Sequence, residues 1–352
     1  MALSKILIED FENIIKSNLN LSKLKSRTIL VTGANGFLAS YFIEFILFAN
    51  RSYNLNAKII ALVRNLDKAK ERFSNYLDND QLIFLHQDVC DKISINNDVD
   101  YILNYASAAS PKVYGINPIS VQNANLLGTI NLLEFAKEKK VKSFLYISSG
   151  EIYGSVDNEK MPISESTFGF LDHTLVRSCY GESKKMAENI CFCWHFQHNS
   201  PIKIARPFHT YGPGMDLNDG RVFSDFVSDI INNRDILIKS DGKDLRAFCY
   251  ISDVTYGFIK ILLDGENGNA YNVGSDIETS IEELGKILIS IFPDKNLSIK
   301  MNTRTDRGTY LNSNIRRGYP SVTKLRNLGW NFDKSVAEGF RRTILFYLNN
   351  KK

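Results

Sequence analysis

The sequence predicts an α/β protein, a Rossmann-type doubly wound parallel sheet with a smaller α/β substrate lobe. Short apolar strands alternate with helical segments as far as about residue 205. This alternation is typical of a parallel sheet with helices on both faces. A glycine-containing turn joins the first strand to the first long helix. Beyond residue 205 the alternation loosens and Gly, Pro and Asp become frequent, which predicts a second, smaller lobe.

The elements are expected in the following order. Residues 1–25 predict one or two amphipathic helices ahead of the main fold. Within a Rossmann domain over 26–205, we expect strands at 28–31, 57–65, 82–85, 100–107 and 143–149, and helices after the glycine turn and at 67–76, 121–139 and 178–198. The substrate lobe should occupy mainly 206–346, with a strand at 235–240, a helix at 281–292, and a segment at about 247–275 that returns to the Rossmann domain.

Composition narrows the class of protein. The 352 residues are 44% hydrophobic and 23% charged, as in ordinary globular proteins, and the net charge of +4 is spread without a basic block. We therefore expect no nucleic-acid partner. The five cysteines are scattered through apolar segments, which favours reduced thiols in a cytoplasmic protein without a metal site. The N-terminal segment contains acidic residues, and no apolar run is long enough to cross a bilayer, so neither a signal peptide nor a membrane partner is expected.

The glycine turn is the first functional signal. The stretch VTGANGFLA places Gly33, Gly36 and Ala39 in a G-x-x-G-x-x-A spacing between a strand and a helix. Small residues allow a tight turn and let the backbone approach a pyrophosphate, which the helix N-terminus attracts through its unpaired N–H groups. The turn therefore predicts a dinucleotide site, and the alternative is a tight strand–helix turn without a ligand.

The end of the second strand bears on the choice of cofactor. Dinucleotide sites often place an acid there to bind the adenosine ribose, but this sequence reads ALVRN, with Arg64 near that point. An arginine suits a 2′-phosphate, so NADP(H) is favoured and NAD(H) is possible. The alternative for Arg64 is a solvated side chain. Asp88, after the third strand, is expected at the adenine edge.

A tyrosine and a lysine lie one helical turn apart in CYGESKK, residues 179–185. Tyr180 and Lys184 should share one helix face. A phenol has a pKa of about 10, and a nearby ammonium lowers it, so the pair can transfer a proton at a sugar or alcohol oxygen. Such a pair also arises by chance. Ser149, at the end of the strand that ends in YISS, can bind the same oxygen, and the three signals together predict a proton-transfer site.

The glycine turn, the serine after a later strand and the Tyr–Lys pair on the next helix follow one another in an order that resembles the extended short-chain dehydrogenase/reductases, the nucleotide-sugar epimerase/dehydratase family. The resemblance covers about residues 26–346 and rests on TGANGFLA, NYASAASP, NANLLGTINLLEFA, SSGEIYG, CYGESK, ARPFHTYGPG, LRAFCYISD, AYNVG and LGW. It implies a Ser–Tyr–Lys catalytic set, a nucleotide diphosphate-sugar substrate and homodimers that pair the two long helices at about 121–139 and 178–198.

Within the family, NDGRVFSDFV and LRAFCYISD are most similar to UDP-glucuronate decarboxylases. The resemblance implies catalytic roles for Ser149 and Glu151 and contact of Arg246 with the substrate diphosphate, with Arg221 as a second candidate. Together with Arg64 and Asp88, the predicted cofactor site is lined by Gly33, Asn35, Gly36, Phe37, Leu38, Val89, Tyr105, Ala106, Ser107, Asn125, Tyr180, Lys184 and Pro207. The implied substrate contacts are Ser110, Ser149, His209, Arg221, Arg246 and Arg307.

Two departures from the family shape the expected reaction. Gly150 stands where dehydratases have an aspartate, so water elimination is disfavoured, and His209 replaces the usual asparagine as either a ligand group or a packed histidine. Because ALVRN resembles NADP(H)-exchanging reductases, the expected activity is reduction of a 4-keto-(deoxy)sugar. The alternative is a redox-neutral decarboxylase, 4-epimerase or dehydratase with tightly bound NAD. A non-catalytic dinucleotide sensor is disfavoured because both Tyr180 and Lys184 are present.

Overall fold

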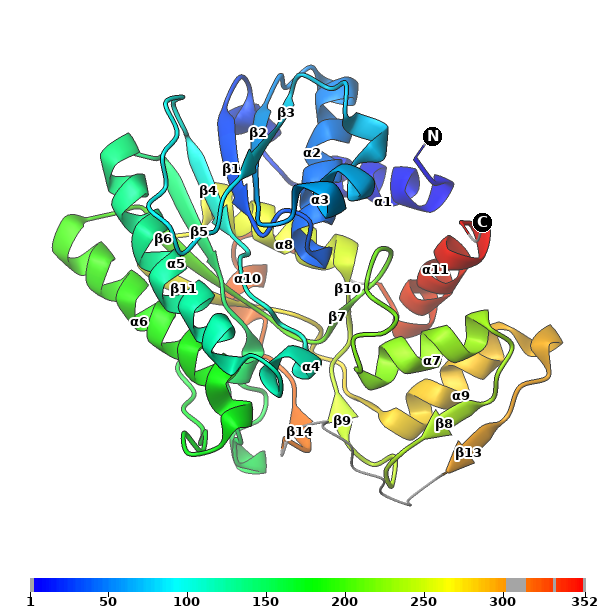
Figure 1. Ribbon diagram of the computed structural model, residues 1–352. Coiled ribbons are helices and arrows are strands. Elements are labelled where there is room, and N and C mark those ends of the chain that lie inside the picture. Colours follow the sequence, from blue (N-terminus) through cyan, green and yellow to red (C-terminus); the bar gives the residue numbers. More distant parts are fainter. Residues whose placement is uncertain (1–2, 302–314, 332–333, 351–352) are drawn as a thin grey trace.

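A seven-stranded, wholly parallel sheet forms the centre of the protein (Figure 1). The computed structural model describes residues 3–301, 315–331 and 334–350. In spatial order the strands of the sheet are β11 (Asn269–Val273), β6 (Ile202–Pro207), β5 (Ser143–Ile147), β4 (Tyr101–Asn104), β1 (Thr28–Thr32), β2 (Lys58–Val63) and β3 (Leu82–His86). The order reverses at β1, so the carboxyl ends of β1 and β4 flank the crevice in which open α/β sheets bind ligands.

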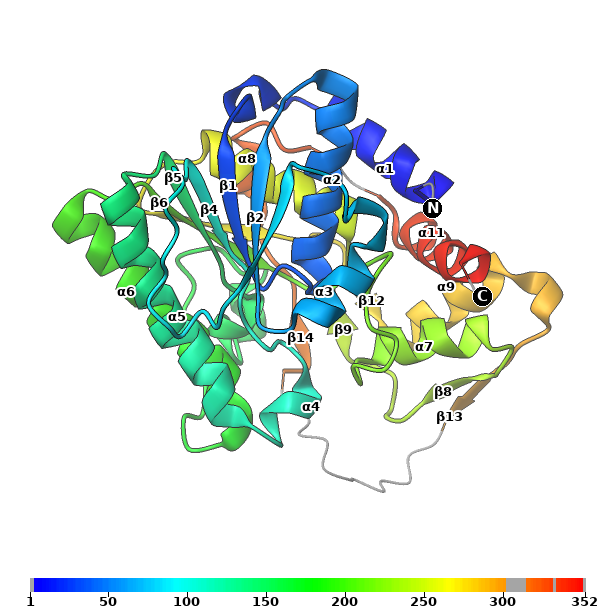
Figure 2. The ribbon, with the colours of Figure 1, turned by 45° about the horizontal axis from the view of Figure 1, so that its top comes forward.

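Helices cover both faces of this sheet, as a doubly wound fold requires. Ile29 and Val31 of β1 face one core with α2 (Phe37–Tyr53), α3 (Leu66–Arg72) and α8 (Ile251–Asp264). Leu30 faces the other core with α5 (Pro118–Lys139) and α6 (Cys179–His198), which lie side by side in both views (Figures 1 and 2). The predicted fold class is thus confirmed, and the alternating side chains of the buried strands explain why each face is apolar.

Several predicted elements differ at their ends, and polar side chains account for the differences. The strand expected at 100–107 ends at Asn104. The Ala106 N–H donates to Thr32 Oγ1 at 3.1 Å instead of to the backbone of a neighbouring strand. The strand expected at 57–65 ends at Val63, since Asn65 caps α3 by accepting from the Lys68 N–H at 2.8 Å. The helix expected at 121–139 begins earlier, at Pro118, behind an Asn117 cap.

Shorter elements connect the sheet to its helices, and later segments of the chain form a smaller lobe beside the sheet (Figure 1). In the first part of the chain the shorter elements are η1 (Leu21–Leu24), η2 (Ser74–Tyr76), α4 (Pro111–Tyr114), η3 (Gly150–Tyr153), η4 (Asn158–Lys160) and η5 (Val176–Ser178). The lobe contains β7 (Thr210–Tyr211), α7 (Val222–Ile231), β8 (Ile236–Ile238), β9 (Leu245–Arg246), β10 (Cys249–Tyr250), β12 (Thr279–Ser280), α9 (Ile281–Ile291), η6 (Pro293–Lys295), β13 (Ile299–Met301), β14 (Arg317–Gly318) and α11 (Val336–Asn349). The short helix α10 (Thr323–Arg326) instead packs against β11 of the central sheet. Within the lobe β12, β9 and β14 form one small sheet, and β13 pairs with β8.

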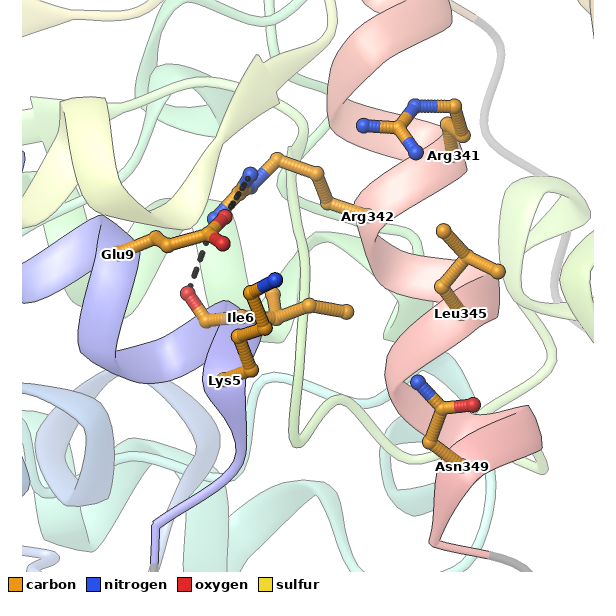
Figure 3. A pocket seen from close by; sticks show the side chains of 7 residues that line it. All are labelled: Lys5, Ile6, Glu9, Arg341, Arg342, Leu345 and Asn349. Atoms are coloured by element: carbon orange, nitrogen blue, oxygen red, sulfur yellow. Dashed lines mark hydrogen bonds and ion pairs between the residues drawn. The ribbon is translucent and has the colours of Figure 1, made fainter.

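The N-terminal helix α1 (Lys5–Lys16) is packed against the body of the fold and lies beside α11 (Figure 2). Asp10 of α1 is fully buried and accepts hydrogen bonds from the hydroxyls of Tyr41 (3.1 Å) and Tyr250 (2.7 Å) and from Arg342 Nε (2.9 Å). Figure 3 shows Arg342 of α11 reaching back to the Glu9 carboxylate and the Ile6 carbonyl. One carboxylate therefore joins α1, α2, β10 and α11.

The lengths and hydropathies of the helices bear on membrane association. Of the helices in the described ranges, none is both long and apolar enough to cross a bilayer.

Candidate active site

The glycine turn lies at the crevice between β1 and β4. Gly33 has φ +59°, and a Cβ there would lie 3.0 Å from the Cα of Ala106, so only glycine fits without strain. Gly36 caps α2 without a side-chain hydrogen bond, which leaves the helix N-terminus at Phe37 and Leu38 open to an anion. A backbone cradle of this kind fits a pyrophosphate.

Two other predicted cofactor residues have unsatisfied polar atoms. Ser107 Oγ and Asn125 Oδ1 are buried and have no hydrogen-bond partner within the described part of the chain. Asn125 donates through its amide to Ser183 Oγ at 2.9 Å, which joins α5 to α6. Because buried polar atoms are normally paired, these two atoms fit contacts to a bound molecule.

The predicted cofactor residues Val89, Tyr105 and Pro207 are placed differently. Val89 packs against Gly128 of α5, where a Cβ would approach its Cγ1 to 2.7 Å. Tyr105 lies in the core between Phe42 and Phe258, with ring centroids 6.3 and 5.8 Å away. Pro207 ends β6. The side chains of Val89 and Tyr105 therefore pack into the cores on the two faces of the sheet.

Arg64 is paired with the other residue predicted near the adenosine. Its guanidinium lies 3.6 Å from the carboxylate of Asp88, and 64% of its side chain is exposed. Burial opposes ionisation of Asp88, but a hydrogen bond from the Cys90 N–H and the charge of Arg64 hold the pKa of its carboxyl below the usual value. The two residues form one surface ion pair at the end of the sheet.

Ser149, Tyr180 and Lys184 come together where β5 and α6 meet. Ser149 follows β5 and accepts the Glu151 N–H at 3.1 Å, which caps η3 and ends the strand two residues before the predicted position. Lys184 donates to the Ile147 carbonyl at 2.6 Å, and its Nζ lies 6.0 Å from the centroid of the Tyr180 ring. The helix and the strand end thus present the three predicted catalytic groups at one point.

The electrostatics of this pair differ from the expectation. Burial raises the pKa of Tyr180 well above its ordinary value, and the nearby charge of Glu151 raises it further. The groups that lower the pKa of Tyr180 are Ser149, through a hydrogen bond, and the cations Arg221 and Arg177. Burial lowers the pKa of Lys184 to about 7, since its ammonium has lost its water. Burial therefore dominates the pKa of Tyr180, and the cations that lower it are Arg221 and Arg177, where the sequence predicted Lys184.

Glu151 is held by an arginine that sequence reasoning missed. Arg177, three residues before Tyr180 on η5, donates to both carboxylate oxygens of Glu151 at 2.9 and 3.1 Å. The same guanidinium lies 4.9 Å from the ring centroid of Tyr114, and that ring stacks on Tyr180 at 5.3 Å and 15°. The only signal in the sequence was the cation just before the tyrosine.

Two of the predicted substrate residues meet through a common partner. Ser110 Oγ donates to the Asp219 carbonyl at 3.3 Å, and Arg221 Nε donates to the Asp219 carboxylate at 2.5 Å. Arg221 also acts electrostatically on Tyr180, so this pair faces the catalytic cluster. Asp219 is a second residue of the site that the sequence did not indicate.

The remaining substrate candidates are on the smaller lobe. Arg246 donates to the carbonyls of Leu245, Ile315 and Arg316, so it also braces β9 against the chain before β14. His209 Nδ1 is buried without a hydrogen-bond partner among the residues described. Burial and the charges of Arg246 and Arg221 lower the pKa of His209 to about 3, so its imidazole is neutral at physiological pH. Arg307 lies outside the described residues.

A Rossmann sheet with a glycine turn, a serine after β5 and a Tyr–Lys pair on α6 defines the extended short-chain dehydrogenase/reductase class. Residues 29–274 match the NAD dependent epimerase/dehydratase family. The protein belongs to this family of enzymes, as its motifs indicated.

Individual relatives support this assignment. UDP-glucuronic acid decarboxylase 6 of Arabidopsis thaliana is 31% identical over 313 residues, which span 88% of this chain and 86% of that protein. An epimerase of Methanothermobacter thermautotrophicus superposes with a TM-score of 0.79 at 22% identity, covering 98% and 96% of the two chains. UDP-glucuronic acid 4-epimerase of Bacillus cereus, solved with UDP-glucuronic acid and NAD, has a TM-score of 0.75 at 21% identity, covering 91% and 98%. The structural likenesses establish the fold.

Proposed function

We propose that this protein is a redox-neutral, NAD-dependent nucleotide-sugar enzyme that oxidises C4 of a UDP-uronate, releases CO₂ from C5 and reduces C4 again. The observation that carries the proposal is the cluster of Ser149, Tyr180, Lys184 and Glu151 in a chain 31% identical to a UDP-glucuronic acid decarboxylase. The 4-keto-sugar reductase expected from ALVRN is not supported by the comparisons, which favour the redox-neutral alternative.

NAD(H) is the cofactor of this proposal. The turn from Gly33 to Leu38 would hold the pyrophosphate, and Ser107 and Asn125 would supply hydrogen bonds from the β4 and α5 side. When bound, the nicotinamide supplies a hydride acceptor that later returns the hydride. A preference for NADP(H) has no support, because solved relatives are described with NAD and Arg64 is paired with Asp88.

The protein's own residues would divide the proton transfers. Ser149 binds the 4-hydroxyl, and Tyr180 removes its proton as C4 is oxidised. The resulting C4 ketone is β to the carboxylate on C5. The bond from C5 to the carboxyl carbon therefore breaks with release of CO₂, and its electron pair stays on the sugar as an enolate whose charge lies on the C4 oxygen. C5 of this enolate takes up a proton from solvent, which the Glu151 carboxylate beside Tyr180 would relay, and Tyr180 returns its proton when C4 is reduced.

The substrate would enter from the smaller lobe. Arg246 and Arg221 provide the cations for a diphosphate, and the neutral His209 offers an unpartnered nitrogen to the sugar or a phosphate. Ser110 is fixed by Asp219 beside Arg221. These assignments rest on the charge of Arg221, which acts on both Tyr180 and His209, and on the charge of Arg246, which acts on His209.

The test has two parts. Mass spectrometry of small molecules released from freshly purified, denatured protein should find NAD near one per chain. Incubation with UDP-glucuronate should then give a UDP-pentose and CO₂ with no net change in nicotinamide absorbance. Conversion to UDP-galacturonate would indicate the 4-epimerase instead. A cofactor-free protein that consumes NADPH with a 4-keto-sugar would overturn the redox-neutral proposal.

A homodimer through α5 and α6 is part of the proposal. These two helices expose the apolar side chains of Ile119, Leu127, Met186 and Phe196. Light scattering after size exclusion should give a mass of twice 40.0 kDa. A monomer at micromolar concentration would contradict the pairing.

A further inference from the structure

Arg177 lies at the centre of a stack of side chains that ends at the catalytic tyrosine. Its guanidinium is bound to both Glu151 oxygens on one side and lies over the Tyr114 ring on the other. Tyr114 is buried and nearly parallel to Tyr180, with 15° between the rings. The members come from four separate elements, η3, η5, α4 and α6, so the arrangement depends on the tertiary fold.

We infer that Arg177 is a positioning residue of the reaction: its guanidinium fixes the Glu151 carboxylate by two parallel hydrogen bonds and supports Tyr114 against the face of Tyr180. This inference rests on the proposed roles of Tyr180 and Glu151. A two-bond arginine–carboxylate pair restricts both position and rotation of the acid. Stacking through Tyr114 fixes the plane of the catalytic phenol in the same way.

Charge balance is the second consequence of this placement. Glu151 lies close enough to Tyr180 to disfavour the phenolate, and Arg177 opposes that effect. The titratable and charged groups that face Tyr180 are Glu151, Arg177, Arg221, Tyr114, Tyr146 and Lys184. Glu151 is the one carboxylate in this set, so it supplies the negative charge that acts on Tyr180. Without Arg177 its charge is opposed mainly by Arg221, and Tyr180 becomes a weaker acid.

The experiment compares Arg177→Met, Arg177→Lys and the double variant Arg177→Met/Glu151→Gln with the wild type. Stopped-flow absorbance records the first formation of NADH from enzyme-bound NAD and UDP-glucuronate between pH 6 and 10. Arg341→Met is the matched control, because Arg341 makes the same two-bond contact with Glu338 on the surface of α11. This step needs Tyr180 as base and does not need the proton that Glu151 would relay to C5.

The rate in Arg177→Met should depend on a group that titrates about one to two pH units higher, with a rate at pH 7 lowered about 10- to 100-fold. Arg177→Lys should shift the pH profile less than Arg177→Met does, because lysine keeps the positive charge but cannot make the two parallel hydrogen bonds to Glu151. The double variant should return towards the wild-type profile, because the opposing charge is gone. A wild-type profile in Arg177→Met, or an equal shift in Arg341→Met, would overturn the inference.

A second readout needs no sugar. Proton release on binding NAD⁺ to cofactor-stripped protein is measured by calorimetry in two buffers with different heats of ionisation. Arg177→Met should release fewer protons than the wild type at pH 8, and equal release would contradict the inference. If the wild type forms no NADH with UDP-glucuronate, the proposed sugar fails, and this measurement alone decides the role of Arg177.

Discussion

Two clusters in this protein contain the same residue types, an acid, an arginine and two tyrosines, in different surroundings. At the junction of α1 and α11, Asp10 is fully buried and bonded to Tyr41, Tyr250 and Arg342. At the crevice, Glu151 is 35% exposed and bonded to Arg177, beside the stacked rings of Tyr114 and Tyr180.

The difference separates a structural cluster from the one proposed to be reactive. The Asp10 carboxylate receives both hydroxyls and the guanidinium, so it has few bonds left to offer a ligand. In the Glu151 cluster the tyrosines interact through their ring faces, which leaves the Tyr180 hydroxyl to Ser149 and to a substrate. Fully satisfied buried networks fix one fold, whereas a partly open network can exchange protons.

The largest effect on turnover is expected from a substitution of Tyr180, the tyrosine proposed to transfer the proton. Tyr180→Phe removes the proton donor and acceptor and should lower turnover about 10²- to 10⁴-fold, a range typical of general acid–base groups. Because the ring and its stacking on Tyr114 are kept, thermal stability and NAD content should stay close to those of the wild type. Steady-state decarboxylation and the released cofactor are measured on the same preparation. Turnover within threefold of the wild type would remove Tyr180 from the mechanism.

The second prediction concerns the structural cluster around Asp10. Asp10→Ala removes the acceptor of two buried tyrosine hydroxyls and one of the two carboxylates bonded to Arg342, which keeps Glu9. It should lower the free energy of unfolding by about 2–4 kcal/mol. Turnover per folded molecule should be almost unchanged, because the partners of Asp10 lie on α2, β10 and α11, away from the catalytic groups. Urea unfolding followed by circular dichroism gives the stability. Glu12→Ala, on the exposed side of the same helix, is the control and should change stability by less than about 1 kcal/mol.

A smaller effect, on the pH dependence of stability, is expected from His209, the neutral histidine of the smaller lobe. The pKa of His209 is about 3 in the folded protein, whereas an unfolded histidine has a pKa of about 6.5. Between these values the unfolded chain binds the extra proton, so the wild type loses stability as pH falls below about 6.5. In His209→Asn this loss in the free energy of unfolding at pH 5 should be smaller by roughly 1–2 kcal/mol. At pH 8, where the histidine is neutral in both states, no such pH-dependent difference is expected.

Thermal unfolding at pH 5 and pH 8 measures the difference. His173→Asn, at an exposed position, is the control and should leave the pH dependence as it is. An equal acid dependence in the wild type and in His209→Asn would mean that His209 is solvated and free to titrate.

Sequence reasoning identified the sheet, which the structure confirms. Local spacing also singled out the glycine turn and the candidate set Ser149, Tyr180 and Lys184, whose catalytic role stays a prediction. Strand ends and helix faces follow from periods of 2 and 3.6 residues, so a serine after β5 and a Tyr–Lys pair on α6 can be placed from the order of residues alone. The family assignment followed from the same motifs and is confirmed by the match over residues 29–274.

The parts that could not be predicted depend on contacts distant in the chain. Asp10 is one acid in an amphipathic helix, and it is buried by packing against Tyr41, Tyr250 and Arg342, the last of which is 332 residues away. Arg177 meets Glu151 across 26 residues through η5, a turn without a periodic signal. The strength of Tyr180 as an acid also depends on burial, which no spacing reveals.

The smallest expected effect concerns Arg64, where a local pattern led to the NADP(H) preference. An exposed ion pair 3.6 Å long contributes less than about 1 kcal/mol, so Arg64→Ala should change NAD affinity by less than about fivefold. Titration of the cofactor-stripped protein with NAD⁺ and NADP⁺ measures both affinities. Asp88→Asn is the matched variant, because it frees Arg64 and should improve NADP⁺ binding relative to NAD⁺. If Arg64→Ala weakened NADP⁺ binding more than tenfold while sparing NAD⁺, Arg64 would be the 2′-phosphate ligand that ALVRN suggested, and its pairing with Asp88 would describe only the cofactor-free state.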